Sequence, residues 1–149
     1  MRISFKGDYA LKTILELSLN YGKGLVKISN IAKRHDIPLK YLEQILLILK
    51  GAGYVNSKRG AGGGYILAKQ PEKIKLGEII RLMEGYTSPI TCVSKSCYSK
   101  CNDEIKCPFR GIWIDIRNLI NNVVDKTTFK DVCKRAEKIQ GAKTVNYEI

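Results

Sequence analysis

The chain has 149 residues, enough for one compact domain with an attached arm, and its hydrophobic content of 44% is ordinary for a globular protein. No run approaches the roughly 18 apolar residues that a membrane span needs, and the N-terminal MRISFKGDYA lacks an apolar signal segment. The chain also has one histidine and no paired acid and base. We therefore expect a cytoplasmic protein that is not an enzyme and does not enter a membrane.

The net charge of +12 is concentrated in the first half of the chain. Residues 1–75 hold 14 Lys and Arg against 5 Asp and Glu, whereas residues 76–149 hold 12 against 9. A concentrated positive field on a small protein attracts a polyanion, most commonly nucleic acid. A basic surface that only keeps the protein in solution is the alternative at this point.

Three helices are predicted in the first half of the chain. Apolar residues at helical spacing predict the first over residues 8–21. Residues 25–28 suit a short strand, after which Ser29 is the expected N-cap of a second helix. Pro38 then opens a third helix, with an apolar face made of Leu39, Leu42, Ile45, Leu46 and Leu49. Two short helices joined by a tight turn form a helix-turn-helix.

A glycine-rich β-hairpin follows the third helix. Val55 lies in its first strand, the residues GAGGG at 60–64 form the turn, and Tyr65 begins the returning strand. Lys58, Arg59 and Gly60 form a tip that suits close approach to a phosphate, with Arg59 reaching a narrow minor groove. A nucleotide-binding loop is disfavoured because no Gly-Lys-Ser/Thr ending is present.

The polar face of the third helix predicts a recognition helix. Lys40, Tyr41, Glu43 and Gln44 lie near its N-terminal end, the end that enters the major groove in helix-turn-helix proteins. Glu43 can accept from a cytosine amino group and Gln44 can pair with adenine, whereas Lys40 and Tyr41 can hold phosphates. Ser29 completes the predicted DNA-binding set. The alternative is that these residues are only a solvated surface.

The second half of the chain predicts three further segments. A fourth helix ends before Gly85 and closes a DNA-binding domain predicted at residues 1–86. Pro108 opens a long helix over residues 108–126, whose apolar stripe is too long for this domain to bury and therefore predicts a two-fold dimer. Thr127 or Thr128 caps a final helix within residues 127–149, on whose apolar side Cys133 is expected as a small core residue.

Four of the five cysteines fall in one polar loop predicted at residues 87–107. They are Cys92, Cys97, Cys101 and Cys107, spaced C-x4-C-x3-C-x5-C. Structural disulfides are rare in a reducing cytosol, so clustered thiolates favour a metal site. No gap has the tight C-x2-C spacing of zinc knuckles, but spacing alone leaves zinc and an iron–sulfur cluster both open.

These motifs together resemble the bacterial winged-helix regulators of the IscR, NsrR and CymR type, and most closely the iron–sulfur regulators of the IscR type. The matching segments are GDYALKTILELS, IPLKYLEQIL, SKRGAGGGYILAK, LGEIIRLMEG and the cysteine loop that runs into CPFRGIW. The resemblance implies a mainly helical fold with a β-hairpin wing and a long dimerisation helix. It also implies a homodimeric transcriptional repressor that reads a near-palindromic double-stranded operator under the control of an iron–sulfur cluster.

The resemblance further implies a ligand set. Cys92 and Cys107 match the family's first and third cysteines, and Cys97 and Cys101 are both candidates for the middle one. Arg110 stands where IscR-type members have a histidine, so the fourth ligand is the additional loop cysteine, which we favour, or Asp8 of the other subunit. A two-iron (2Fe–2S) cluster is favoured over a four-iron (4Fe–4S) one. The alternatives are a cluster-free regulator controlled by thiol redox or a partner protein, and a zinc-stabilised DNA-binding protein.

Overall fold

The computed structural model describes residues 1–147 of the protein, and the side chains of residues 1–143. It is mainly helical with one antiparallel β-hairpin, as predicted. Residues 148 and 149 of the predicted C-terminal segment lie outside the described residues. The elements in chain order are α1 (Phe5–Leu19), α2 (Ile28–His35), α3 (Leu39–Gly51), β1 (Val55–Lys58), β2 (Gly64–Leu67), the short 3-10 helix η1 (Pro71–Lys73), α4 (Leu76–Glu84), the 3-10 helix η2 (Thr91–Val93), α5 (Arg110–Val124) and α6 (Phe129–Tyr147).

Helix α1 lies at the centre of the N-terminal part and contacts α2, α3, α4, β2 and α6. Apolar side chains from all these elements meet in one core, because each amphipathic helix turns its apolar face inward. The largest fully buried residues of this core are Ile14, Leu17, Ile31, Leu42, Ile45, Leu46, Leu49, Val55, Ile74, Ile79 and Phe129. The predicted apolar face of the third helix is therefore confirmed except at Leu39, which is 48% exposed in the first turn of α3.

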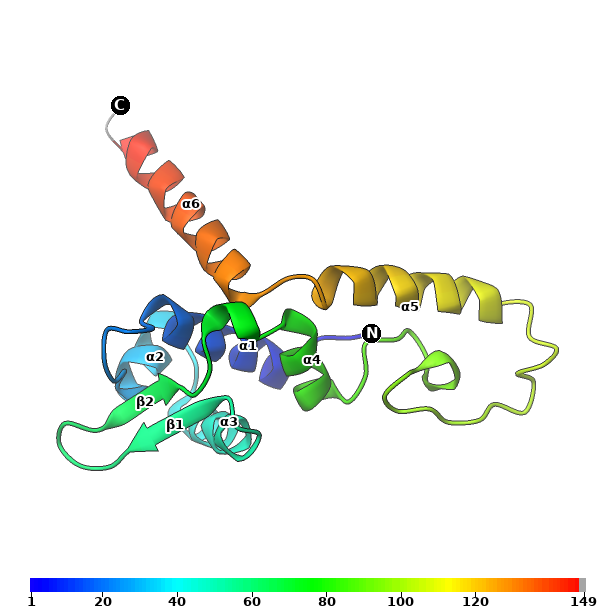
Figure 1. The fold of residues 1–149 in the computed structure, drawn as a ribbon, viewed down its shortest axis with the longest axis horizontal. Helices are drawn as coiled ribbons and strands as arrows, with labels where there is room; N and C mark the ends of the chain where they lie inside the picture. Colours follow the sequence, from blue (N-terminus) through cyan, green and yellow to red (C-terminus); the bar gives the residue numbers. More distant parts are fainter. Residues whose placement is uncertain (148–149) are drawn as a thin grey trace.

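The hairpin wing stands beside α3 (Figure 1). Strands β1 and β2 pair with Val55 opposite Leu67 and Lys58 opposite Gly64. Val26 adds a single bridge, in which its N–H donates to the Tyr65 carbonyl (2.9 Å) and its carbonyl accepts from the Tyr65 N–H (2.8 Å). The strand predicted over residues 25–28 is thus reduced to one bridging residue, since α2 already begins at Ile28.

The start of α1 and the start of α2 differ from the prediction, each for a local reason. Helix α1 begins three residues earlier because Ser4 is its N-cap and accepts from the Gly7 N–H through its hydroxyl. Ser29 is not the N-cap of α2, because Lys27 takes that position without a side-chain cap. The bridge at Val26 holds the preceding backbone extended, so the helix begins before Ser29 can act as a cap.

Helix α5 and the cysteine loop project to one side of the body, and α6 extends away in another direction (Figure 1). Within α5 only Val124 is buried, whereas Ile112, Leu119 and Val123 are more than half exposed. The helix begins at Arg110, two residues after Pro108, where the prediction placed its start. Its outer apolar stripe therefore has no cover within the described part of this chain.

Helix α6 has the predicted cap. The Thr128 hydroxyl accepts from the Asp131 N–H (3.1 Å), and the Asp131 carboxylate accepts from the Thr128 N–H (2.9 Å) and hydroxyl (2.8 Å). These reciprocal bonds are a capping box. They lower the pKa of Asp131 below its ordinary value, because the ionised form accepts both hydrogen bonds.

Candidate DNA-binding surface and cysteine loop

The helix-turn-helix is formed by α2 and α3. Asp36 joins them in the left-handed conformation, with φ of 51°, and Pro38 then precedes the first turn of α3. On the inner side, Glu16 of α1 accepts from Arg34 (3.1 Å) and lies 3.0 Å from the His35 ring nitrogen. Glu16 is only 3% exposed, so this group fastens α2 to the core. His35 thus serves to hold α2 against α1 through Glu16.

The predicted recognition residues share one exposed face. Lys40, Tyr41, Glu43 and Gln44 are all exposed, while their neighbours Leu42 and Ile45 are buried. The Tyr41 ring also packs edge-on against the Tyr9 ring of α1, with centroids 6.5 Å apart. The helix therefore presents a polar strip at its N-terminal end, where side chains of a recognition helix reach base edges.

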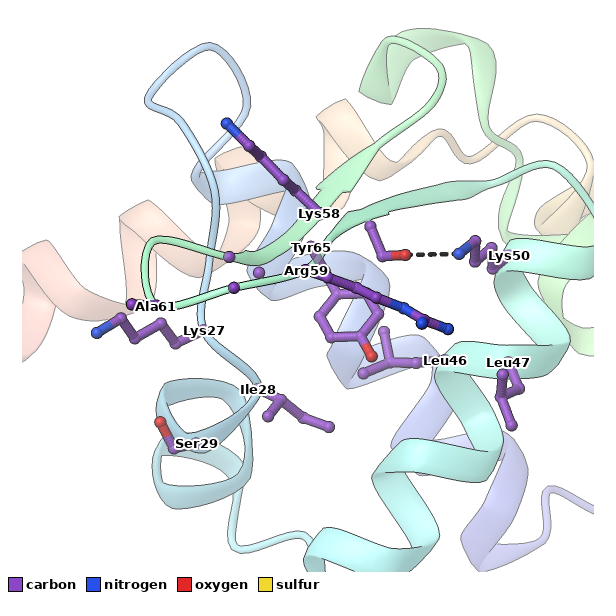
Figure 2. Close-up of a pocket in the computed structure, with 14 residues that line it drawn as sticks. Lys27, Ile28, Ser29, Leu46, Leu47, Lys50, Lys58, Arg59, Ala61 and Tyr65 are labelled. Atoms are coloured by element: carbon purple, nitrogen blue, oxygen red, sulfur yellow. Dashed lines mark hydrogen bonds between the residues drawn. The ribbon is translucent and has the colours of Figure 1, made fainter.

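A groove of about 510 Å³ runs between the first turn of α2, the C-terminal half of α3 and the wing. Its cations are Lys27, Lys50, Lys58 and Arg59, and none of its described lining residues is acidic. Figure 2 shows the Arg59 side chain directed from the wing toward α3, whereas Lys58 points away from α3. Ser29 lies exposed at the α2 side of the same groove. This arrangement suits the negative charge of a phosphate backbone.

Two cations outside the predicted DNA-binding set line the same groove as Ser29 and Arg59. Lys27 precedes α2, and Lys50 near the end of α3 donates to the Ser57 hydroxyl of β1 (2.6 Å). Neither residue carries a local sequence signal beyond its charge. They join Ser29 and Arg59 only because the hairpin folds back between α2 and α3.

The wing's glycines are required by its tight geometry. Gly60 has φ of 110°, a conformation that side chains disfavour. A Cβ on Gly64 would come within 2.6 Å of the Val26 carbonyl oxygen, so the bridge to Val26 needs glycine there. The glycine run thus shapes the turn and keeps Arg59 close to the groove, and a nucleotide need not be invoked to explain it.

The four loop cysteines occupy different environments. Cys92 lies in η2 and is only 9% exposed, whereas Cys97 is exposed and its thiol lies 3.3 Å from the Gly85 carbonyl oxygen. Cys101 and Cys107 are half-buried. The N–H of Arg110, the first residue of α5, donates to the Cys107 carbonyl (3.4 Å). Cys107 thus lies just before α5, as the sequence predicted, although the helix begins three residues after it.

The donor chemistry of the loop fits an iron–sulfur cluster or zinc, since both take thiolates. The arrangement does not fit: among the side chains of residues 1–143, no three His, Cys, Asp or Glu lie close enough to hold a metal ion together. Asp8, the alternative fourth ligand, pairs instead with Lys12 on α1 (2.7 Å). Metal ligation requires a loop conformation that differs from this one.

A polar cluster, made of Tyr98, Glu104 and Arg110, holds the cysteine loop in its observed conformation. Glu104 accepts from the Tyr98 hydroxyl (2.7 Å) with one carboxylate oxygen and from the Arg110 guanidinium (2.7 Å) with the other. The hydrogen bond to Glu104 raises the pKa of Tyr98, because the neutral phenol is the form that donates it. The cluster ties the middle of the loop to the first residue of α5.

A second tie joins the loop to α5 farther along the helix. The Arg117 guanidinium donates to the Val93 carbonyl of η2 (2.8 Å). None of the residues in these two ties belongs to the predicted site, because their pairing depends on how the irregular loop folds. Arg110 alone carried a signal, as the residue that replaces a histidine of IscR-type proteins.

Comparison with known proteins agrees with this architecture. A family model described as Rrf2, iron-dependent transcriptional regulator, matches residues 3–135. The chain belongs to the Rrf2 family. The predicted resemblance to IscR- and CymR-type regulators is therefore confirmed.

Both regulator types occur among the relatives of this Rrf2 protein. It is 37% identical to CymR of Bacillus subtilis over 142 residues, or 95% of this chain and 96% of that protein. The solved structure of that CymR, described as the global cysteine regulator, matches with a TM-score of 0.78 and covers 91% of this chain and 98% of that one. The structure of T. potens IscR matches at 35% identity and a TM-score of 0.75, over 94% and 91% of the two chains.

A third relative is the CymR of another bacterium. The structure of the oxidized form of Staphylococcus aureus CymR matches this Rrf2 chain at 34% identity with a TM-score of 0.72, covering 89% of this chain and 96% of that one.

The relatives are transcriptional regulators, so the chain is a transcriptional regulator that binds DNA. Within residues 1–147, no helix has the length and apolar character needed to cross a bilayer.

Proposed function

We propose that this Rrf2 protein is a cytoplasmic homodimer that represses transcription from a near-palindromic operator and is not an enzyme. The observation that carries the proposal is the exposed strip of Lys40, Tyr41, Glu43 and Gln44 beside the acid-free cationic groove. The strip supplies groups for reading bases, and the groove supplies charge for phosphates. A surface that only kept the protein in solution would not need a base-reading strip and a cationic groove next to each other on a helix-turn-helix.

The exposed stripe of α5 supports the dimer. Ile112, Leu119 and Val123 lie on a 15-residue helix that projects from the body. An apolar stripe of this kind is stabilised by packing against a second helix, and two-fold pairing buries the same stripe of both chains. Two α3 helices related by such an axis would contact half-sites about one helical turn of DNA, or a multiple of it, apart.

The loop at residues 87–107 is the proposed sensor, and an iron–sulfur cluster is the proposed cofactor. The ligands would be Cys92, Cys97, Cys101 and Cys107, with Asp8 of the second subunit as the alternative to one thiolate. When bound, a two-iron or four-iron cluster supplies a redox-sensitive group. Arg110 and Arg117 tie the loop to α5. A change in loop conformation would therefore change the contacts of the proposed dimer helix directly.

A cluster-free regulator is the second candidate. Among the described residues, no three of the four thiols come together as a metal site in this conformation, and relatives of the CymR type cover nearly the whole chain. In this case thiol oxidation or a partner protein acts on the loop. A structural zinc is the third reading of the same donors.

One anaerobic preparation tests the cofactor. Iron, acid-labile sulfide and zinc are measured on the same sample, together with the visible absorption spectrum and EPR after dithionite reduction. Iron with matching sulfide supports the cluster and indicates its nuclearity. Zinc without sulfide supports the structural metal, and absence of all three after attempted reconstitution supports the cluster-free regulator.

A further inference from the structure

A polar cavity of about 300 Å³ lies where α4, α5 and the loop after α4 meet. Its volume is at the lower end of the range for small-molecule sites, about 300 to 1,000 Å³. Every described residue that lines it is polar or charged, and hydroxyl groups come from residues 87, 88, 94 and 96. It is separate from the groove beside the wing, with which it shares no lining residue.

The cations of this cavity are only partly neutralised. Arg81 is paired with Asp125 through two hydrogen bonds of 2.7 and 2.8 Å. Among the described residues, the acceptors of Arg117 are both neutral, the Val93 carbonyl and the Asn118 side chain. Lys95 has no carboxylate partner among the described residues. Asp125 is the one acid among the described lining residues, and it is paired with Arg81, so the positive charges of Lys95 and Arg117 are not balanced within the cavity.

A buried hydroxyl adds an unused donor. Ser94 is 7% exposed, and its oxygen accepts from the Cys97 N–H (3.0 Å). Across the described residues, no hydrogen bond uses the proton of this hydroxyl. A buried donor without an acceptor is costly, so a ligand oxygen at this point would be stabilising.

We propose that the cavity binds a small oxyanion, either a free ion or the phosphate-type headgroup of a small metabolite. Lys95 and Arg117 would supply its charge, and the Ser94 hydroxyl would donate a hydrogen bond. The ligand would join the loop segment between Cys92 and Cys97 to α5. The site thus gives the regulator a small-molecule input that needs neither a metal nor DNA.

Calorimetric titration of the full-length protein with inorganic phosphate tests the proposal, with chloride at matched ionic strength as the blank. We expect saturable binding of one phosphate per chain. Lys95→Gln should weaken it about tenfold, since a charge-assisted hydrogen bond is lost. The matched control is Lys100→Gln, an exposed lysine of the same loop outside the cavity, which should leave the affinity unchanged. Ser94→Ala is the second variant and should also weaken binding.

The titration distinguishes a metabolite headgroup from a free ion, and both of these from the absence of a site. Tighter binding of glycerol phosphate than of inorganic phosphate identifies a metabolite headgroup, and the reverse identifies a free ion; both sustain the proposal. Heat that does not exceed the chloride blank overturns it, as do equal losses in the Lys95 and Lys100 variants, which would reflect general charge attraction. Because no DNA is present, failure here leaves the proposed DNA-binding function standing.

Discussion

The Arg81 guanidinium binds the Asp125 carboxylate through two parallel hydrogen bonds, Nη1 to Oδ1 (2.7 Å) and Nη2 to Oδ2 (2.8 Å). Arg81 lies on α4, which packs against α1 of the DNA-binding half, and Asp125 is the C-cap of α5. Nη2 also donates to Asn121 of α5 (3.1 Å). The position of the projecting helix relative to the DNA-binding face therefore depends on this pair.

Gly77→Ala should disturb the junction of α4 and α5. A Cβ at Gly77 would clash with the Asp125 carboxylate and come within 2.9 Å of both Arg81 Nη1 and the Val124 side chain. We expect the free energy of unfolding in urea to fall by about 1–3 kcal/mol. Gly141→Ala is the control, because its Cβ meets nothing within 4 Å, and it should stabilise α6 by up to about 1 kcal/mol. Equal effects of the two substitutions would contradict the tight junction.

Arg59→Ala should weaken operator binding about tenfold and reduce the salt dependence of the affinity by about one phosphate contact. Arg59 is exposed and directed into the groove, so its loss should not affect folding. Fluorescence anisotropy over a range of salt concentrations measures both quantities. Lys138→Ala, which removes an exposed cation on α6, should change neither, and an equal loss in that variant would indicate a general charge effect.

Glu43→Ala should relax base preference more than it weakens overall binding. If Glu43 accepts from a cytosine amino group, its removal lowers discrimination at that base pair by about 1–3 kcal/mol. Competition between operators that differ at single positions measures the change. Glu72→Ala removes an exposed acid on η1 and should leave the preference intact. An unchanged preference in the Glu43 variant would remove this residue from the readout.

The capping box of α6 should be sensitive to acid. Hydrogen bonds from Thr128 lower the pKa of Asp131, so this carboxylate stabilises the folded chain above the unfolded-state pKa of about 3.9. That stability is lost as the pH falls through the lower, folded-state value. Asp131→Asn should thus be less stable than the wild type at neutral pH, and the difference should shrink as the pH falls below about 4. Asp115→Asn is the exposed control on α5. A difference that persists in acid would contradict the ionised cap.

Thiol reactivity should differ between Cys97 and Cys133. Cys97 is exposed, whereas burial, together with the nearby Glu137 carboxylate, raises the pKa of Cys133 and leaves less thiolate to react. Mass spectrometry after brief anaerobic alkylation near pH 8 should find Cys97 labelled well before Cys133. In urea the two rates should become similar. Faster labelling of Cys133 in the folded protein would contradict its placement.

The DNA-binding half could be predicted from the sequence because its signals are local. Apolar spacing in α3 predicted Leu42, Ile45, Leu46 and Leu49 as core residues, and the glycine run predicted the wing. Leu39 was mispredicted because it lies in the first turn of α3, where less of the helix is covered. The Ser29 cap failed for a non-local reason, the bridge from Val26 to Tyr65.

The cysteine loop could not be predicted to the same depth. The spacing of its thiols indicated donor chemistry, but their positions depend on Glu104 meeting Tyr98 and Arg110, and on Arg117 meeting Val93. Such contacts join an irregular segment to a distant helix and leave no periodic signal in the sequence. The sequence therefore predicts which atoms could bind a metal, and the contacts of the loop decide whether they converge.

Selection of bound duplexes from a random DNA library by the full-length protein tests the proposed operator recognition. We expect enrichment of a near-palindromic site with two half-sites about one helical turn, or a multiple of it, apart. We also expect that Glu43→Ala shifts the enriched bases while Arg59→Ala lowers the yield. A library that remains random after repeated rounds, or an enriched site without two-fold symmetry, would contradict the proposed operator recognition.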